Sequence, residues 1–428
     1  MIVGAVAALY AVVRRWTASP QAAGLAAAAL AVGANLHAYC EGGNLTEIYV
    51  LLPATLSMYF FSRGLPEFRA RRMFLSGCAA GVAALFKPPG LAPVLAQGAF
   101  VLALVIARRA PVRTLFRCIF WTTLGLTVAW LPAVMYFGHY GAVGALLEAS
   151  FLYNVRYGAA SQPHLPQLLH NAARHLSPVA PLVFCAVICL IAALRSETDR
   201  DVALSGGRSL RPLLWLNLLW IAGDLAGSLA GGRHYGHYFL PMIPSLSASA
   251  GLAYAIFFPP RGEADRRLAR LALVLLVVGP IAMGQAVEAA ALARPPETVP
   301  GIPPWDQMAA RLRAEGRPGD TLFVWDYLPG IYFQSGLSNA DLFLDASYRI
   351  DYKGAEDRFG FALLQRLKAR PPTFFVRAEG PDAPPLAAIP GPEDRALIAD
   401  VDAWLNRDFV KVAATGSLKL YRHKTDND

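Results

Sequence analysis

The sequence predicts a polytopic α-helical membrane protein that carries a small C-terminal α/β domain. Hydrophobic residues make up 55% of the chain and charged residues only 16%, and the mean hydropathy is +0.38. A soluble domain needs more polar surface than this composition offers, so the membrane class follows. Apolar runs fill a transmembrane domain over 1–292, a proline-rich linker follows over 293–304, and a soluble domain occupies 305–428.

The transmembrane domain is expected to contain about ten helices, each near the ~20 residues that cross a bilayer. The fourth and fifth helices meet at Lys87-Pro88-Pro89-Gly90, which no continuous helix crosses, because proline removes a backbone donor and restricts the residue before it. The segment 138–175 is too long to be a simple turn. The ten helices are expected over roughly 1–13, 20–38, 46–62, 72–87, 90–107, 114–137, 176–194, 212–230, 238–258 and 268–292.

The soluble domain shows strand and helix patterns in alternation, which predicts a small α/β fold. Buried strands are expected at TLFVW (321–325) and TFFVR (373–377), with a terminal hairpin or strand over 411–422. Helices are expected over 305–315, 328–336, 356–370 and 393–407.

Lysine and arginine crowd into every second loop of the transmembrane domain, with eighteen in one set of loops and four in the other. Because cationic loops stay in the cytoplasm, this alternation predicts a multi-pass protein of the inner membrane whose C-terminal domain is periplasmic. It also places Met1 outside, so we expect the first part of the chain to be missing. The cytoplasmic set is Arg14, Arg15, Arg63, Arg69, Arg71, Arg72, Arg108, Arg109, Arg113, Arg117, Arg195, Arg200, Arg208, Arg211, Arg261, Arg266, Arg267 and Arg270; the outer set is Lys87, Arg156, Arg174 and Arg233.

The net charge of +9 does not indicate a nucleic-acid partner. Residues 1–292 carry 22 cations and 11 anions, whereas residues 293–428 carry 17 cations and 19 anions. The excess is therefore the topology signal itself, and nucleic-acid binding is excluded. Four of the five cysteines lie in apolar spans and none in the C-terminal domain, which excludes a disulfide framework.

All eight histidines fall on the predicted outer side, together with acids at the membrane edge. His37, Glu41 and Glu47 lie in the corner HAYCEGGNLTEIY, between the second and third expected helices. Imidazole and carboxylate groups suit a bound divalent cation or a general base. Alternatively, the corner is a capped hairpin, in which Asn44 or Thr46 caps the third helix and Glu47 favours its positive end.

Lys87 and Asp224 are the two charged candidates within apolar surroundings. The Lys87 ammonium, beside backbone freed by two prolines, suits the phosphate of a lipid; the alternative is an interface anchor. Asp224 lies about two turns inside the eighth helix, where a carboxylate is a functional candidate. Its expected partner is Arg233 or a lipid-borne group, and the alternative is a helix contact with Asn217 or Ser228.

The densest outward polar cluster is RHYGHY, residues 233–238. Contact of Arg233 and His237 with a phosphate or sugar is favoured over zinc binding by His234 and His237, because the surrounding glycines predict a loop. Tyr238 is a further candidate for contact with the donor, and the alternative is interface anchoring by Tyr235 and Tyr238. Arg156, between two tyrosines in YNVRYG, suits a sugar or pyrophosphate, but equally an interfacial helix.

Four segments occur in a characteristic order, namely GNLTEIYVLLPATLSMYFF, ARRMFLSGCAAGVAALFKPPGL, FLYNVRYG and GGRHYGHYFLPMIPSLSA. In this order they resemble the GT-C membrane glycosyltransferases, specifically the bacterial protein-mannosyltransferase and aminoarabinose-transferase type of glycosyltransferase family 39. The resemblance covers about 1–292, and the C-terminal domain is similar to the small outer domain of many members. It implies an enzyme that takes a sugar from a polyprenyl-phosphate donor and passes it to a lipid, glycan or protein acceptor on the outer face of the membrane.

The chain departs from the family at the catalytic acid, which members usually carry in a first outer loop. Its first helix matches the family's second, so we expect the chain to be N-terminally truncated and inactive alone unless Glu47 or Asp224 substitutes. The resemblance implies a phosphate role for Lys87 and Arg233, a donor contact for His237, and an orienting or metal-linked role for Glu47. A divalent cation is a candidate cofactor, with His37, Glu41 and His234 as candidate ligands.

Two other classes of function stay open. A transporter or lipid flippase would use Asp224 and the helix break at Lys87, although the sequence shows no inverted repeat. A non-catalytic membrane scaffold would use the C-terminal domain to bind a partner.

Overall fold

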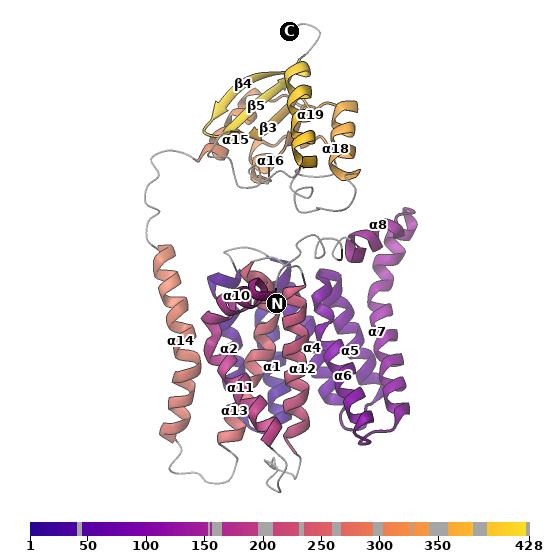
Figure 1. The fold of residues 1–428 in the computed structure, drawn as a ribbon, viewed down its shortest axis with the longest axis vertical. Helices are drawn as coiled ribbons and strands as arrows, with labels where there is room; N and C mark the ends of the chain where they lie inside the picture. Colours follow the sequence, from indigo (N-terminus) through magenta and orange to yellow (C-terminus); the bar gives the residue numbers. More distant parts are fainter. Residues whose placement is uncertain are drawn as a thin grey trace. The chain divides into compact units, whose positions relative to one another are not determined.

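The computed structural model describes residues 1–40, 45–152, 155, 165–195, 209–230, 235–258, 267–293, 303–326, 328–341, 358–379 and 392–424. The chain divides into two compact units (Figure 1). The first, here called the helical unit, comprises 1–158 and 162–294. The second, the sheet unit, comprises 159–161 and 295–428.

The described part of the helical unit consists of helices. Pro88 and Pro89 end one helix and begin the next, as the sequence predicts, because neither proline can continue the first helix. The elements are α1 (Ile2–Thr17), α2 (Pro20–Gly33), α3 (His37–Cys40), α4 (Thr46–Gly64), α5 (Ala70–Phe86), η1 (Pro88–Leu91), α6 (Ala92–Ile106), α7 (Val112–His139), α8 (Val143–Leu147), η2 (Glu148–Leu152), α10 (Leu165–Leu176), η3 (Ser177–Val179), α11 (Ala180–Arg195), α12 (Arg211–Leu229), η4 (Gly236–Met242), α13 (Ile243–Phe257) and α14 (Arg267–Ala293).

Among the described residues, five helical segments are long and apolar enough to cross a membrane. The expected count of ten is therefore not supported. α1, α2 and α5 form where predicted but have 16, 14 and 17 residues, which is short for a span. α4 has 19 residues, but its charged and hydroxyl side chains lower its hydropathy. The five segments are Pro88–Ile106, Val112–His139, Leu165–Arg195, Arg211–Leu229 and Gly236–Phe257.

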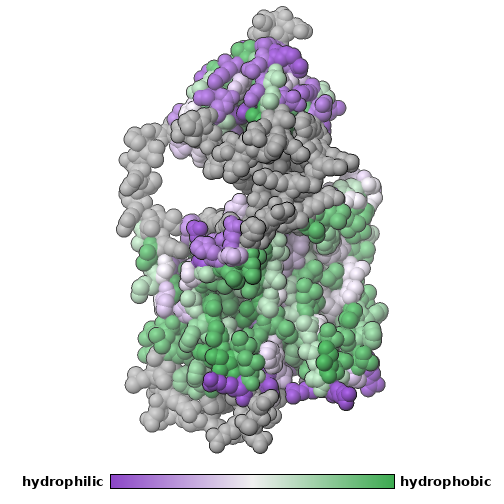
Figure 2. All heavy atoms as spheres, in the orientation of Figure 1, coloured by the Kyte–Doolittle hydropathy of each residue, from purple (hydrophilic) through white to green (hydrophobic). Residues whose placement is uncertain are grey.

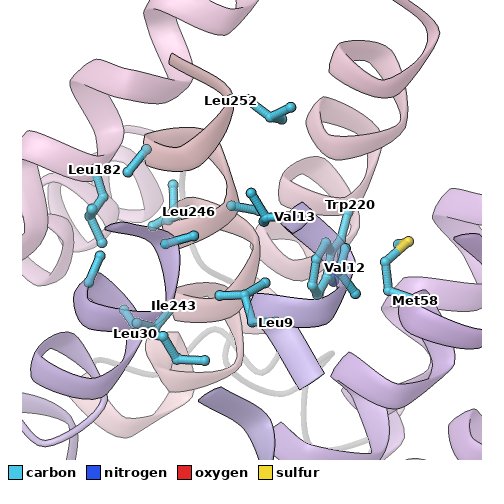
Figure 3. Packing of buried hydrophobic residues seen from close by; sticks show 14 of the residues in the cluster. Leu9, Val12, Val13, Leu30, Met58, Leu182, Trp220, Ile243, Leu246 and Leu252 are labelled. Carbon is cyan, nitrogen blue, oxygen red and sulfur yellow. The ribbon is translucent and has the colours of Figure 1, made fainter. Parts of the chain in front are cut away.

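Side chains on the outside of the helical unit are largely hydrophobic, as Figure 2 shows in green. α7 contributes much of this apolar surface, whereas α13 is buried inside the unit and packs against α1, α2, α11 and α12. Such exposed apolar helices are typical of proteins that contact lipid, and they support a membrane location. Figure 3 shows the packing around α13, with Leu9, Val12, Val13, Leu30, Met58, Leu182, Trp220, Ile243, Leu246 and Leu252 labelled.

α5 and α7 pack backbone to backbone. A Cβ on Gly77 would lie 2.0 Å from the carbonyl oxygen of Thr122, and one on Gly125 would lie 2.0 Å from that of Phe74. Only glycine fits at these two positions, and small residues of this kind are the common means by which membrane helices approach closely.

Arginines cap helix C-termini at one end of the helical unit, which we call the arginine end. Arg15 Nε donates to the Ser62 carbonyl oxygen at 2.8 Å, near the end of α4. Arg211 Nε donates to the Ala193 carbonyl oxygen at 3.2 Å, near the end of α11. The last carbonyls of a helix carry partial negative charge, so a guanidinium is favourable there.

The sheet unit is a small α/β structure built on a five-stranded sheet with the strand order β2-β1-β3-β5-β4. β2, β1 and β3 are parallel, whereas β5 runs antiparallel to both β3 and β4. Its elements are α15 (Pro304–Glu315), β1 (Thr321–Val324), α16 (Gly330–Ser335), β2 (Ser338–Asn339), α18 (Arg358–Ala369), β3 (Phe374–Ala378), α19 (Pro392–Asp408), β4 (Phe409–Thr415) and β5 (Leu418–His423).

Each face of this sheet is covered by helices. Leu312 and Ile331, from α15 and α16, lie in one apolar cluster with Val324. Leu364 and Trp404, from α18 and α19, lie in the other cluster. The elements predicted from the sequence all form, and the terminal segment is a hairpin. β2 was not predicted, because two residues leave no periodicity to detect.

Candidate functional site

Glu47, Lys87, His237 and Tyr238 meet at the end of the helical unit opposite the arginine end. The Lys87 ammonium forms an ion pair with Glu47 Oε1. His237 Nε2 lies 3.8 Å from the same oxygen, and Lys87 Nζ lies 3.9 Å from the centroid of the Tyr238 ring. These four residues, here called the polar site, come from α4, from the end of α5 and from η4.

Glu47 is held in the first turn of α4, with only 2% of its side chain exposed. Its Oε1 faces Lys87 and His237, while its Oε2 accepts a hydrogen bond of 3.0 Å from Thr46 Oγ1. A carboxylate at a helix N-terminus is favourable because the free backbone N–H groups carry partial positive charge. Leu45 is the N-cap residue and makes no side-chain cap, so the alternative in which Thr46 caps the helix is wrong, and the Thr46 hydroxyl donates to Glu47 instead. Asn44, the other cap considered, lies outside the described residues.

Lys87 ends α5 and is placed by the turn that follows it. Its backbone N–H donates to the Ala83 carbonyl oxygen at 3.1 Å, and its own carbonyl accepts from the Gly90 N–H at 2.9 Å. A Cβ on Gly90 would lie 2.6 Å from the Ala83 carbonyl carbon, so glycine lets this turn fold back onto α5. The ammonium is thereby directed to Glu47, with 24% of the side chain exposed.

Gly236 fixes the position of His237 and Tyr238. A Cβ on Gly236 would lie 2.0 Å from the Ala38 carbonyl oxygen, so η4 reaches α3 only because this residue is glycine. The imidazole of His237 then packs edge-on against the Tyr238 ring, with 4.7 Å between the ring centroids.

A second set of contacts supports η4, and the sequence analysis did not identify it. The buried Tyr39 hydroxyl donates to the His175 carbonyl oxygen at 2.6 Å, and the His175 ring stacks on Phe239 at 5.2 Å between centroids. Three segments far apart in the chain thus join behind the polar site. The sequence does place aromatic residues at each predicted outer helix end. That pattern alone does not predict which of these aromatic residues contact one another.

Asp224, the other catalytic candidate, lies apart from these residues in a buried contact between α12 and α13. Its Oδ2 accepts a hydrogen bond of 2.6 Å from Ser245 Oγ, and only 4% of the residue is exposed. Ser228 Oγ donates to the Asp224 backbone carbonyl at 2.9 Å, whereas Asn217 Nδ2 donates to Ser249 Oγ at 2.8 Å. The expected partner Arg233 lies outside the described residues, and the described contacts match the alternative in kind, since Ser228 bonds the backbone of Asp224. The partner of the carboxylate itself is Ser245, and Asn217 does not contact it.

Several predicted site residues lie outside the described residues, namely Glu41, Arg156, Arg233 and His234. His37 is described and begins α3, the short helix against which η4 packs. Within the described part of the chain, no group of three or more His, Cys, Asp or Glu side chains is arranged to hold a metal ion. Since two of the three candidate metal ligands are among the residues not described, a divalent cation stays a prediction.

One apolar cavity has a lining residue, Leu91, that lies four positions after Lys87 in the chain. It has a volume of about 300 Å³ between α6 and α7 and is lined by residues that include Leu91, Val94, Leu115 and Leu126. Leu91 is the last residue of η1, the turn that Lys87 precedes. Its lining suits an aliphatic chain and offers few polar contacts.

The polar site combines a position for an anionic group with a group that can accept a proton. An ammonium and an imidazole face one oxygen position, which suits an anion, while the aromatic ring covers the ammonium and the carboxylate is a candidate base. No protein-family model matches the chain, and no curated protein matches it at a significant level. The chemistry of the site, together with the motifs in the sequence, therefore carries the functional argument.

Proposed function

We propose that this chain is a membrane glycosyltransferase that moves a sugar from a polyprenyl-phosphate donor to an acceptor, at the membrane face where Lys87 lies. The observation that carries the proposal is the convergence of Lys87 and His237 on one oxygen of Glu47 beneath the Tyr238 ring. The motifs that resemble the GT-C glycosyltransferases include Glu47, Lys87 and His237, so the resemblance and the geometry concern the same residues.

Lys87 is assigned to the donor phosphate. When the sugar leaves a polyprenyl phosphodiester, the phosphate gains negative charge, and an ammonium placed beside it stabilises the transition state. Lys87 is the only lysine in residues 1–292. A lysine is flexible enough to follow a phosphate whose charge changes during the reaction.

Glu47 is assigned to the acceptor. Transfer requires a base that takes the proton of the acceptor hydroxyl, and a carboxylate within hydrogen-bond reach can do so. His237 adds a second polar contact to the donor, and Tyr238 shields the ammonium from water. The cavity between α6 and α7 suits the aliphatic part of the donor, because isoprenoid units are apolar.

The test is sugar transfer from a radiolabelled polyprenyl-phosphate donor by the full chain in lipid nanodiscs. Lys87→Ala is expected to lower transfer at least 100-fold, because an ammonium is lost where phosphate charge develops. Arg69→Ala is the matched control, since Arg69 is an exposed cation at the arginine end. Equal transfer by the wild type and by Lys87→Ala would refute the phosphate role.

The same assay separates the other classes of function. A transporter or flippase is favoured by the broken passage from α5 through η1 into α6. It would move the intact donor between leaflets and release no sugar. A scaffold would show neither movement nor release, and Lys87→Ala would change nothing.

A further inference from the structure

The polar site already holds an anion, which is the carboxylate of Glu47. Building on the proposed function, we propose that Glu47 Oε1 marks the subsite of the donor phosphate. In this proposal the phosphate displaces the carboxylate from Lys87 when the donor binds. The free site is then a paired resting state, and the donor-bound site contains an unpaired carboxylate.

The geometry of Lys87 and His237 leads to this assignment. Lys87 Nζ and His237 Nε2 both face Glu47 Oε1, and the Tyr238 ring covers the ammonium on another side. Of the three donor hydrogens of the ammonium, the carboxylate uses one and the ring covers another side, so one is left for a further contact. Lys87 and His237 both face the position of Oε1, so an incoming phosphate oxygen that contacts both side chains takes the position that Oε1 now fills.

Electrostatic repulsion prevents the donor phosphate and the Glu47 carboxylate from sharing Lys87, so one replaces the other. The side chain of Glu47 is 2% exposed and that of His237 is 16% exposed, so water screens the charges poorly. Two anions within about 4–6 Å of each other disfavour one another's charged forms. A phosphate and the Glu47 carboxylate thus compete for the ammonium.

Thr46 can hold the Glu47 carboxylate after Lys87 has left it. Its hydroxyl donates to Oε2, the oxygen that does not face Lys87. Glu47 can therefore lose Lys87 and keep one hydrogen bond at the N-terminus of α4. Donor binding then exposes an unpaired carboxylate beside the sugar, which couples the arrival of the donor to the availability of the base.

The test measures binding of farnesyl phosphate to the full chain in nanodiscs, with farnesol and inorganic phosphate as separate arms. Glu47→Gln removes the competing charge and nearly preserves shape, so farnesyl phosphate is expected to bind about tenfold tighter. Glu47→Asp, whose carboxylate is drawn back from Lys87, is expected to bind more tightly than the wild type by a smaller factor. Glu67→Gln is the matched control, since Glu67 is an exposed carboxylate paired with Arg69 at the arginine end.

The possible outcomes separate the exchange from the proposed function. Tighter binding by Glu47→Gln, together with loss of binding by Lys87→Ala, supports both. Equal or weaker binding by Glu47→Gln and Glu47→Asp, with Lys87→Ala still deficient, overturns the exchange and leaves the phosphate role of Lys87 intact. If farnesol binds as well as farnesyl phosphate in every variant, the phosphate site itself is wrong. Binding of inorganic phosphate alone would assign the site to free phosphate and not to a lipid.

Discussion

Glu47 and Asp224 are two buried carboxylates in one helical unit, with 2% and 4% exposure, but their partners differ in kind. Glu47 faces an ammonium and an imidazole at a helix end, whereas the Asp224 carboxylate accepts from the hydroxyl of Ser245 between two packed helices. Burial alone therefore does not identify a functional acid. The charge and mobility of the partner decide whether a ligand can replace the carboxylate.

The surroundings of the two carboxylates also differ in what can move. Lys87 lies on a turn between two helices, so its side chain can follow a ligand without disturbing the helix packing. Asp224 lies within α12, where Ser228 donates to its backbone carbonyl, and its carboxylate is bonded to Ser245 of the packed helix α13. We therefore expect Glu47 to govern ligand binding and Asp224 to govern helix packing.

The largest effect is expected from removing the cation of the polar site alone. Lys87→Met leaves the Glu47 carboxylate buried without its ion-pair partner, and we expect a loss of about 3 kcal/mol in stability. The double variant Lys87→Met with Glu47→Gln removes both charges and should recover most of that loss. Thermal unfolding in nanodiscs measures both. If the double variant is no more stable than Lys87→Met, the ion pair is not what stabilises this end.

The second effect concerns the backbone contact that places His237. Gly236→Ala brings a Cβ into the Ala38 carbonyl, so η4 must shift, at an expected cost of about 1–3 kcal/mol and with weaker binding of farnesyl phosphate. The control is Gly24→Ala in α2, where a Cβ meets nothing within 4 Å. Wild-type melting and affinity for Gly236→Ala would show that η4 tolerates displacement and that His237 is not held as described.

The third effect tests whether Asp224 is a structural residue. Asp224→Asn keeps an acceptor for Ser245 and should change stability by less than about 1 kcal/mol, whereas Asp224→Ala should cost more because it leaves a cavity. Ser245 also donates to the Met242 carbonyl oxygen at 3.0 Å, which limits the loss. Sugar transfer per folded molecule should not change. Loss of transfer in Asp224→Asn at wild-type stability would place Asp224 in the chemistry after all.

The sequence predicted the local features of the fold well, because their causes are local. The helix break follows from Pro88 and Pro89, and the end of α16 follows from Gly336, whose φ is 74°. The number of spans could not be derived in the same way. α4 forms a helix of suitable length, but the polar groups that make it a poor span, such as Ser57, are satisfied by Ser76 and Gln97 on neighbouring helices.

The residues of the polar site could be predicted from the sequence, but their pairing could not. Sidedness placed Glu47, Lys87 and His237 at one membrane face, yet Glu47 and Lys87 are 40 residues apart and nothing local joins them. The same limit applies to Asp224, because the partner of its carboxylate, Ser245, lies on another helix and was not predicted. The usable signal was the spacing of Ser245 and Ser249 by one helical turn, which marks a polar stripe facing α12.

The smallest effect on stability is expected at a third carboxylate, Glu379, which lies in the sheet unit. In the sheet unit, the Tyr421 hydroxyl donates to Glu379, whose side chain is 30% exposed. Burial, and next the hydrogen bond to Glu379, raise the pKa of Tyr421 above its ordinary 10.0. Because the folded pKa is raised, the stabilisation is fully present below pH ~10 and is lost as the pH rises further.

Tyr421→Phe should therefore cost only about 0.5–1 kcal/mol at neutral pH, since Glu379 can be hydrated instead. Above pH ~10 the variant should lose less stability than the wild type, because it has no phenol to deprotonate. Calorimetry of the full chain between pH 8 and 11 (a range set about the phenol pKa of ~10) measures this difference. If the stability of the two proteins changes with pH in parallel, deprotonation of the Tyr421 hydroxyl does not affect stability in this range. The hydrogen bond between Tyr421 and Glu379 would then contribute less to stability than the bond between Ser245 and Asp224.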